Sequence, residues 1–367
     1  MDAPSRRDFL KHLAAGAALT AGGALDALDA VSRPPALGAQ PRVAGRTYTN
    51  PVFAGSLPDP SVIRHRGVYY GFGTTGGDFK PDGRAFTVVR SPDLVEWEEL
   101  GGALTPPVQG AGVQYWAPEV AEHEGRFYLY YAVGTPGEER MALRVATSAR
   151  PEGPYADTGA PLVECTHNRF AIDAHPFRDA DGRWYLFYAR NYPEAGGGFK
   201  AGTGLAVDRL VGMTRLAGEC RTVLRARYDW TLYEADRKMA AYGRTFDEWH
   251  TIEGPFVRRH RGQYYCFYSG ANWQTPRYGV DYAVADRVTG PYTGAGREAR
   301  VLRGVPGKVR GPGHHSIVEG PDGRDYVAYH AWNADLTVRQ LCIDPLEWTP
   351  GGPRVTPTVT PQRLTPP

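Results

Sequence analysis

The sequence of 367 residues has little cysteine and almost no net charge. Its four cysteines include no Cys-x-x-Cys pair, which argues against a zinc ribbon or a redox motif. The formal charge of +2 comes from 42 basic and 40 acidic residues spread throughout the chain, so there is no electrostatic footprint for nucleic acid or an anionic membrane. A neutral ligand is therefore favoured, with no nucleic acid as a partner.

A long apolar run is also missing, even at the start of the chain. The segment from Ser5 to Lys11 matches the twin-arginine export signal nearly residue for residue, and an Ala/Gly-rich, mildly apolar stretch follows from Leu13 to Leu25. Asp26 and Asp29 interrupt this stretch before it reaches the ~20 residues needed to span a bilayer. We expect residues 1–39 to be a signal peptide and linker, and the mature protein to be periplasmic or extracellular and free of the membrane.

Long runs of Ala, Leu, Glu and Lys are scarce after residue 40, whereas the chain has 45 glycines, 31 prolines and 22 tyrosines. This composition indicates many short strands joined by tight turns. Five glycines each open an aromatic strand, at intervals of 58, 57, 80 and 61 residues: Gly67, Gly125, Gly182, Gly262 and Gly323. With four strands per unit, the repeat predicts an all-β fold, a five-bladed β-propeller of four-stranded antiparallel blades around a central funnel, over residues 40–367.

The second repeat illustrates the four strands of a unit. We expect them at 117–122, 126–133, 141–147 and 155–163. The last strand of the chain should close the ring against the segment near Tyr48 to Phe53.

The third interval is about 20 residues longer than the others. The excess lies between Arg225 and Ile252 and is rich in aromatic residues, including Trp230, Tyr233 and Trp249. Insertions in loops cost little, so an ordinary surface insertion is one interpretation. The aromatic content favours the other, a loop that overhangs the pocket and shapes the substrate site.

Counting back eight or nine residues from the repeat glycines reaches a set of polar and aromatic positions: Asp59, Trp116, Asp173, Glu253 and His314. Equivalent positions in a closed ring of repeats lie at the same height around one axis. Single aspartates in turns are often satisfied by backbone amides. Three carboxylates that share a funnel, however, repel one another and raise at least one pKa, which indicates a functional site.

The local sequence divides these carboxyl groups by role. Hydrolysis of a glycosidic bond needs one protonated carboxyl to donate a proton and one ionised carboxyl to activate water or attack carbon. Glu253 has apolar neighbours that should desolvate it and keep it protonated, as a general acid requires. Asp59 lies between two prolines that hold it in place as a general base. Asp173 would be a third carboxylate that raises the pKa of the acid.

Several aromatic and imidazole side chains are candidates for binding substrate. Trp116 could stack on the apolar face of a sugar ring, or it could pack in the core. Trp230 belongs to the aromatic insertion. His175 and His330 are further candidates, although a histidine on a strand is often a satisfied core residue.

Motifs along the whole chain after residue 40 resemble those of glycoside hydrolase family 43. The motifs are Leu57-Pro58-Asp59-Pro60-Ser61-Val62-Ile63, Trp116-Ala117-Pro118-Glu119, Ile172-Asp173, Glu253-Gly254-Pro255 and Gly311-Pro312-Gly313-His314 followed by Ser316. The resemblance implies a five-bladed propeller that inverts the anomeric centre of α-L-arabinofuranosides or β-D-xylosides in arabinan, arabinoxylan or xylooligosaccharides. It also implies Asp59 as general base, Glu253 as general acid and Asp173 as the modulator of its pKa.

His314 is similar to the histidine that, in many arabinan-cleaving members, helps to hold a largely water-coordinated calcium ion in the central channel. The resemblance thus points to a structural Ca²⁺, with no cofactor required for the chemistry. Because calcium prefers oxygen ligands, one histidine does not decide between a metal site and a substrate-binding side chain. His315 leaves open which imidazole faces the axis.

Two alternative functions and one disulfide stay open. A non-catalytic glycan-binding propeller would need the aromatic platform but not the pair of Asp59 and Glu253. A retaining propeller that cleaves sucrose or fructans would need characteristic segments that are not evident in this sequence. Cys165 and Cys220 flank the third repeat and could form a disulfide after export, while Cys266 and Cys342 lie within predicted strands and should be buried.

Overall fold

The computed structural model describes residues 46–163 and 168–364. Within these ranges the chain forms β-strands and three short 3-10 helices, namely η1 (Pro136–Glu138), η2 (Asp229–Thr231) and η3 (Ala240–Tyr242). No helix in this part of the chain is long and apolar enough to cross a bilayer. The all-β prediction is confirmed. The twin-arginine segment and Cys165 lie outside the described residues, so the export signal and the disulfide to Cys220 stay predictions.

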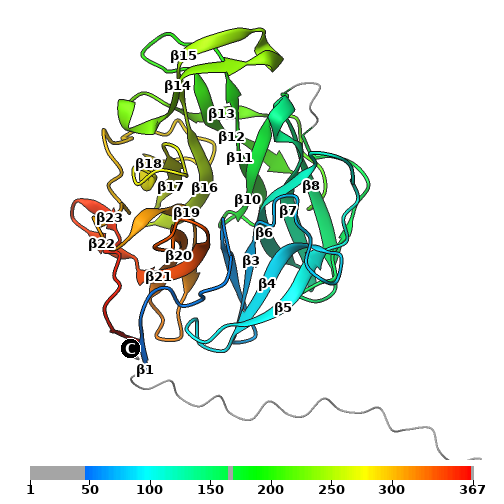
Figure 1. Ribbon diagram of the computed structural model, residues 1–367, viewed down its shortest axis with the longest axis vertical. Helices are drawn as coiled ribbons and strands as arrows, with labels where there is room; N and C mark the ends of the chain where they lie inside the picture. Colours follow the sequence, from blue (N-terminus) through cyan, green and yellow to red (C-terminus); the bar gives the residue numbers. More distant parts are fainter. Residues whose placement is uncertain (1–45, 164–167, 365–367) are drawn as a thin grey trace, which may run out of the picture. The chain divides into compact units, whose positions relative to one another are not determined.

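Five sheets of three to six strands follow one another along the chain (Figure 1). The first sheet contains β2 (Ser61–His65), β3 (Val68–Gly73), β4 (Ala85–Ser91) and β5 (Glu98–Leu104), and the second contains β6 (Gln114–His123), β7 (Arg126–Thr135), β8 (Arg140–Ser148) and β9 (Ala156–Asp157). The third contains β10 (Ala171–Arg178), β11 (Trp184–Tyr192), β12 (Gly202–Leu210) and β13 (Arg221–Arg225), with β14 (Leu232–Met239) and β15 (Arg244–His250) added beside β12. The fourth contains β16 (Ile252–His260), β17 (Gln263–Gly270) and β18 (Gly279–Ala285), and the fifth contains β19 (Arg310–Glu319), β20 (Asp325–Trp332) and β21 (Arg339–Pro345).

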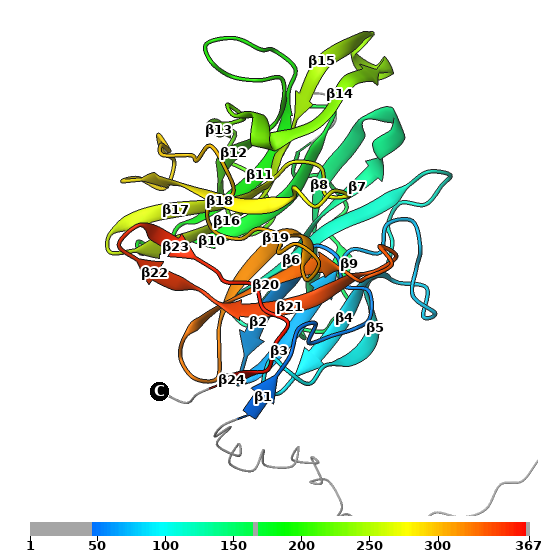
Figure 2. The same cartoon turned by 60° about the vertical axis from the view of Figure 1, so that its left-hand side comes forward.

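The first strands of the five sheets contact one another in sequence order. β2 contacts β6, β6 contacts β10, β10 contacts β16, β16 contacts β19, and β19 returns to β2 (Figure 2). Each of these first strands pairs antiparallel with the next strand of its own sheet. This arrangement brings residues at the start of each first strand, which are far apart in sequence, toward one place.

The fourth strand that the repeat predicts is missing from the fourth and fifth sheets. Beyond β18 only single bridges form, from Val284 to Thr293 and from Val280 to Leu302. Pro291 lacks a backbone donor, and the glycines that follow it favour turns, so this segment does not pair continuously. After the fifth sheet, β22 (Glu347–Thr349) and β23 (Gly352–Arg354) form a hairpin of their own.

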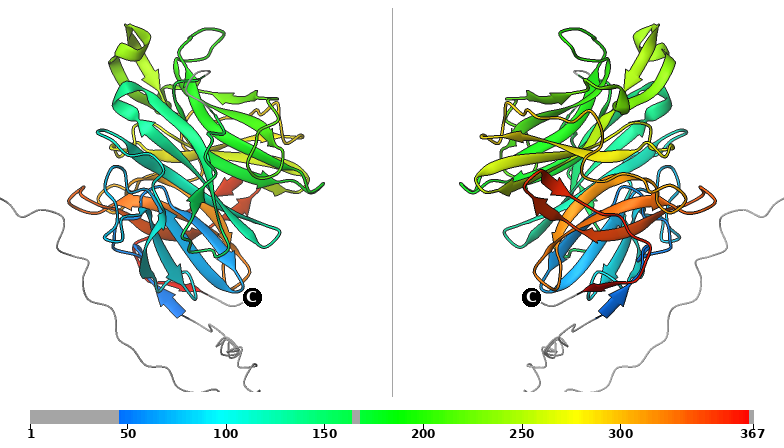
Figure 3. Two further views of the ribbon diagram at one scale, coloured as in Figure 1. Left: turned by 90° about the vertical axis from the view of Figure 1, so that its right-hand side faces the viewer. Right: turned by 90° about the vertical axis from the view of Figure 1, so that its left-hand side faces the viewer.

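The two ends of the described chain pair with each other, as predicted from the repeat. β1 (Arg46–Tyr48) is antiparallel to β24 (Gln362–Leu364) (Figure 3). Next to this pair, the buried Asn50 side chain donates hydrogen bonds to the carbonyl oxygens of Ile343 at 2.9 Å and Thr358 at 3.0 Å. It also accepts one from the backbone N–H of Ile343. Polar contacts therefore join the start of the described chain to its end.

Aromatic residues fill the space between neighbouring sheets. Between the first and second sheets, Tyr115 lies edge to face with Phe86 at 5.9 Å between ring centroids and stacks on Tyr131 at 6.0 Å. Such pairs add to the stabilisation that comes from burial alone. Trp97 packs against buried residues of the first and fifth sheets and donates its indole N–H to the carbonyl of Leu94.

Candidate active site

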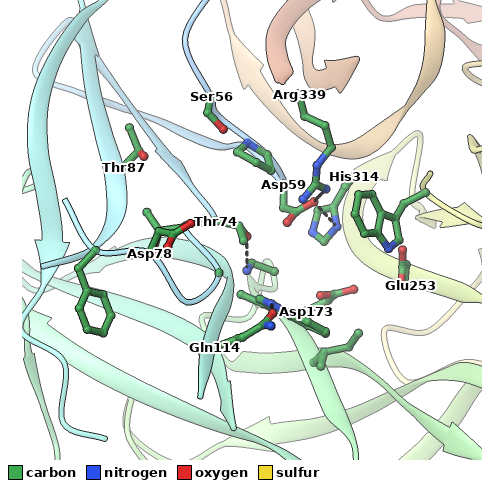
Figure 4. Close-up of a pocket in the computed structure, with 18 of the residues that line it drawn as sticks. Ser56, Asp59, Thr74, Asp78, Thr87, Gln114, Asp173, Glu253, His314 and Arg339 are labelled. Atoms are coloured by element: carbon green, nitrogen blue, oxygen red, sulfur yellow. Dashed lines mark hydrogen bonds and ion pairs between the residues drawn. The ribbon is translucent and has the colours of Figure 1, made fainter. Parts of the chain in front are cut away.

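A pocket of about 600 Å³ is lined by all five residues at the repeat offset, namely Asp59, Trp116, Asp173, Glu253 and His314. Asp59 lies two residues before β2, and the other four lie in the first halves of β6, β10, β16 and β19. Figure 4 shows the carboxyl groups of Asp59, Asp173 and Glu253 directed into the same space. The pocket therefore collects three acidic groups, one imidazole and one indole.

Beside the pocket, one residue in or just before each first strand has a left-handed backbone conformation, with a positive φ angle. The φ angles are 54° at Asp59, 45° at Ala117, 58° at Asp173, 55° at Gly254 and 44° at His314. In four of the five sheets the strand register shifts at the same point. Bulges of this kind re-aim side chains and are frequent beside active sites. The strain at the four positions other than glycine is repeated around the pocket, which indicates that it serves the site.

Asp59 is held ionised by its neighbours. Its carboxylate accepts a hydrogen bond from the Arg339 guanidinium at 2.8 Å, and its backbone N–H donates to Nδ1 of His330 at 3.1 Å. Burial alone would raise the pKa of Asp59, but Arg339, together with His314 and His330, outweighs burial and lowers that pKa well below its usual value. Asp59 is thus a carboxylate, available to accept a proton.

Glu253 has the opposite electrostatic environment. Burial raises its pKa to about 7, and the charge of Asp59 adds to the effect. The hydroxyl of Tyr278 donates a hydrogen bond to Oε1 of Glu253 at 2.8 Å and limits the rise without cancelling it. Glu253 is therefore largely protonated below about pH 7 and can donate a proton there.

Asp173 is the third carboxyl group. It accepts a hydrogen bond from the backbone N–H of Gly254 at 2.9 Å, directly beside Glu253. Its side chain is buried, and burial together with the charge of Glu253 raises the pKa of Asp173 well above its usual value. The two acidic groups interact closely enough that their titrations are coupled.

The walls of the pocket are aromatic and polar. Trp116 donates its indole N–H to the side chain of Gln114 at 2.8 Å, which fixes the ring at the pocket edge. Tyr233 and Trp273 also line the pocket. Trp273 lies under the Arg339 guanidinium, whose central carbon is 4.5 Å from the ring centroid. An aromatic wall suits the apolar face of a sugar ring.

Comparison with known proteins decides the family. Residues 48–353 match the sequence model of glycosyl hydrolases family 43. The chain belongs to this family. A β-D-galactofuranosidase of Aspergillus niger is 29% identical over 83% of each chain. An extracellular exo-α-(1→5)-L-arabinofuranosidase of Streptomyces chartreusis is 28% identical over 89% of this chain and 92% of its own.

A solved structure agrees with this assignment. The crystal structure of a thermostable family-43 glycoside hydrolase has 31% sequence identity and a TM-score of 0.72, over 86% of this chain and 98% of that one. Membership of family 43 makes the protein a glycoside hydrolase. It argues against the non-catalytic glycan-binding alternative and against the retaining group that cleaves sucrose or fructans.

Two of the predicted substrate-binding residues lie outside the pocket of this family 43 enzyme. His175 is buried between strands, where its ring contacts Glu119 at 2.5 Å and accepts the backbone N–H of Val257 at 3.0 Å. Trp230 stacks on Tyr268 and donates its indole N–H to the carbonyl oxygen of Gly296. Both side chains are occupied by protein contacts, so we do not assign them to substrate.

Two residues that contact the carboxyl groups, Arg339 and Tyr278, were not predicted from the sequence, whereas His330, a predicted candidate, lies against Asp59. Arg339 and Tyr278 belong to or precede the third strand of a sheet, and His330 lies on a second strand, so none occupies the repeat offset. The Gly-aromatic spacing contains no signal for them. Of the adjacent histidines, His314 lines the pocket, whereas His315 is buried behind it against Phe267.

The described residues contain no group of three or more His, Cys, Asp or Glu side chains arranged to hold a metal ion. The imidazole of His314 instead faces Asp59, with 3.5 Å between Nδ1 and Oδ1. This donor set does not fit a metal site built from protein ligands. Calcium stays a prediction of the family resemblance, and no step of the mechanism below uses it.

Proposed function

We propose that the protein hydrolyses α-L-arabinofuranosidic bonds of arabinan or arabinoxylan, or of oligosaccharides derived from them, with inversion at the anomeric carbon. The observation that carries this proposal is the division of the carboxyl groups in one pocket. The pKa of Asp59 is held low by Arg339, while that of Glu253 is raised to about 7 by burial. Paired carboxyl groups with pKa values shifted apart supply the base and the acid of glycoside hydrolysis.

In this mechanism Asp59 takes a proton from a water molecule, which attacks the anomeric carbon. Glu253 donates its proton to the glycosidic oxygen as the bond to the leaving group breaks, and Tyr278 orients its carboxyl group. Asp173 opposes the ionisation of Glu253, because two ionised carboxyl groups in one buried site repel each other. Trp116 and Trp273 supply apolar faces against the sugar.

Two relatives support a furanoside as the substrate, and their names give two different furanose sugars. One is described as an exo-α-(1→5)-L-arabinofuranosidase and another as a β-D-galactofuranosidase. These two glycosides share the configuration of their ring substituents and differ in the length of the carbon chain outside the ring. A β-D-galactofuranoside is therefore the second candidate substrate, and a β-D-xyloside, which has a six-membered ring, ranks after both.

We also propose that the five sheets are the blades of a propeller and that their first strands surround its axis. The contacts from β2 through β6, β10 and β16 to β19 and back support this arrangement. Export by the twin-arginine pathway to the periplasm or the exterior is proposed from the Ser5 to Lys11 segment. The extracellular Streptomyces chartreusis relative supports the destination.

A panel of substrates tests the proposed sugar. The purified protein would be incubated with the 4-nitrophenyl glycosides of α-L-arabinofuranose, β-D-galactofuranose and β-D-xylopyranose, and with arabinan and arabinoxylan. We expect the highest kcat/KM on the arabinofuranoside and release of arabinose from the polymers. Faster cleavage of the galactofuranoside would select the second candidate, and cleavage of the xyloside alone would contradict a furanose site.

A further inference from the structure

A second cavity, of about 210 Å³, adjoins the main pocket, and we call it the side cavity. Five residues line both spaces: Trp116, Ile172, Tyr233, Glu253 and Trp273. The wall that belongs to the side cavity alone includes Glu139, Asn191, Arg237, Trp249 and Thr251. At about 30 Å³ per molecule of liquid water, this volume has room for several waters or for a sugar ring.

The aromatic insertion builds one side of the cavity. Tyr233 and Arg237 come from β14, and Trp249 comes from β15. The Arg237 guanidinium bonds to the Glu139 carboxylate of the second sheet at 3.0 Å and lies over the Tyr233 ring at 4.8 Å. These contacts join the β14–β15 hairpin to the rest of the site and fix the positions of its aromatic side chains.

Asn191, which lines this cavity, carries an unpaired polar atom. Its side chain is only 3% exposed, and its amide N–H₂ group donates to the Tyr242 hydroxyl at 2.9 Å and to Oε2 of Glu139 at 3.3 Å. The opposite orientation of the amide would direct its oxygen at the Glu139 carboxylate, so the nitrogen belongs where it is. The carbonyl oxygen Oδ1 then has no hydrogen-bond partner among the described residues. A buried acceptor without a donor is costly and calls for a ligand that supplies one.

The charges in the side cavity favour a neutral ligand. Arg237 is bonded to both Glu139 and Glu234 at 3.0 Å, so its positive charge is already paired. An anionic ligand would meet the two carboxylates instead of a free cation. Trp249 is buried beside this ion pair, and Trp116 and Tyr233 line both the side cavity and the main pocket. Aromatic walls with a hydroxyl acceptor suit a neutral sugar ring.

Glu253 fixes the direction in which such a ring would lie. It lines both spaces, whereas Asp59 and Asp173 line only the main pocket. A general acid must reach the glycosidic oxygen, which joins the cleaved sugar to the leaving group. The base and its water lie on the opposite face of the cleaved sugar. The side cavity is therefore on the leaving-group side of the reaction.

We propose that the side cavity binds the first sugar ring of the leaving group and that Oδ1 of Asn191 accepts a hydrogen bond from one of its hydroxyls. This inference rests on the proposed glycosidase function and adds a residue that determines specificity for the leaving group. It predicts that the enzyme discriminates between a sugar and an aryl leaving group of similar size, because a nitrophenyl ring has no hydroxyl to donate.

The test compares kcat/KM for a disaccharide and for the 4-nitrophenyl glycoside of the same terminal sugar. For Asn191→Ala we expect the ratio of disaccharide to aryl activity to fall about tenfold relative to wild type. Thr251→Val, which keeps the side-chain shape and removes a hydroxyl from the cavity wall, should lower the ratio in the same direction. Gln263→Ala, an exposed amide at the far end of the β16–β17 hairpin, serves as the control and should leave the ratio unchanged.

The results distinguish failure of the proposed subsite from failure of the proposed glycosidase function. Equal losses on both substrates, or a ratio equal to that of wild type, would overturn the subsite, because Asn191 would then be structural or bonded to water alone. Cleavage of the aryl glycoside by every variant keeps the glycosidase function and shows that the protein folds. If wild type cleaves neither substrate, the proposed function fails. Calorimetry with the disaccharide then still tests the cavity, because equal binding by wild type and Asn191→Ala would overturn the proposed subsite.

Discussion

Asp59 and Glu253 carry the same functional group but differ in their neighbours. Arg339 lies 2.8 Å from the carboxylate of Asp59, whereas Glu253 meets a neutral tyrosine hydroxyl and is otherwise desolvated. The positive charge stabilises the ionised form of one group, and burial stabilises the protonated form of the other. At the scale of the residue, the proposed reaction depends on this difference.

The first prediction concerns the basic limb of the pH profile. Glu253 must be protonated to act, so kcat/KM should fall as the pH rises through about 7. Asp173→Asn replaces one of two buried carboxyl groups that repel each other when both are ionised, so Glu253 should ionise more easily and the limb should move to lower pH. The variant can still accept the hydrogen bond from Gly254. A basic limb at the wild-type position would show that Asp173 does not raise the pKa of the acid.

The second prediction concerns the acidic limb. Asp59 must be ionised to act, and Arg339 keeps its pKa low. In Arg339→Met the pKa of Asp59 should rise by about one unit or more, so the acidic limb should move to higher pH. Arg339→Lys retains the positive charge and should keep the limb near its wild-type position. Identical acidic limbs in wild type and the Met variant would rule out Arg339 as the source of the low pKa.

The sequence predicts residues at the repeat offset better than their partners. Asp59, Asp173, Glu253 and His314 can be found from spacing, because equivalent positions of a repeat face one pocket. Arg339 cannot be found in this way, since it begins the third strand of the fifth sheet and reaches Asp59 only through the closed arrangement of the sheets. Pairing between distant strands depends on tertiary structure that a spacing does not contain.

At the scale of elements, the β14–β15 hairpin distinguishes the third sheet from the others. The long interval predicts an insertion that overhangs the pocket, and Tyr233 of this hairpin does line it. Trp230, in η2 before the hairpin, instead packs on Tyr268. Aromatic composition indicates that a loop has apolar contacts to make, but it does not say which ring faces solvent, substrate or core.

The third prediction tests how the hairpin is held. Arg237→Ala removes the ion pair with Glu139 and the stacking on Tyr233. Because Glu139 is nearly buried and would lose its partner, we expect a loss of stability of about 1–3 kcal/mol and a severalfold rise in KM for oligosaccharides. The measurements are thermal unfolding and steady-state kinetics.

An exposed ion pair gives the matched control. Arg303 and Glu298 are also 3.0 Å apart, but both are more than half exposed. Arg303→Ala should therefore change the melting temperature very little. If the two variants behaved alike, the Arg237 pair would not anchor the hairpin.

At the scale of the whole molecule, the described chain is closed by contacts between its two ends. The repeat predicts the pairing of the first and last strands, because a ring of sheets needs a closing contact. It does not predict that the fourth and fifth sheets stop at three strands. Local prolines and glycines decide whether an outer strand pairs, while the repeat reflects only the inner strands and their turns.

The fourth prediction concerns this closure. Asn50→Ala removes an amide that bonds to the backbone of Ile343 and Thr358 and leaves their buried groups without partners. We expect a loss of about 2–4 kcal/mol in the free energy of unfolding, read from denaturant titration. Asp335→Ala, in an exposed turn, is the control and should stay within about 0.5 kcal/mol of wild type. Equal stabilities of the Asn50 variant and wild type would show that the ends do not hold the molecule closed.

The central claim is that Asp59 and Glu253 act as the base and acid of an inverting glycosidase. Proton NMR during the first minutes of arabinofuranoside cleavage tests it most directly, with Asp59→Asn and Glu253→Gln measured beside wild type. We expect wild type to release only the inverted β-anomer first and each variant to be slower by about 10²–10⁴-fold. Initial release of the α-anomer, or near-normal rates in either variant, would contradict it.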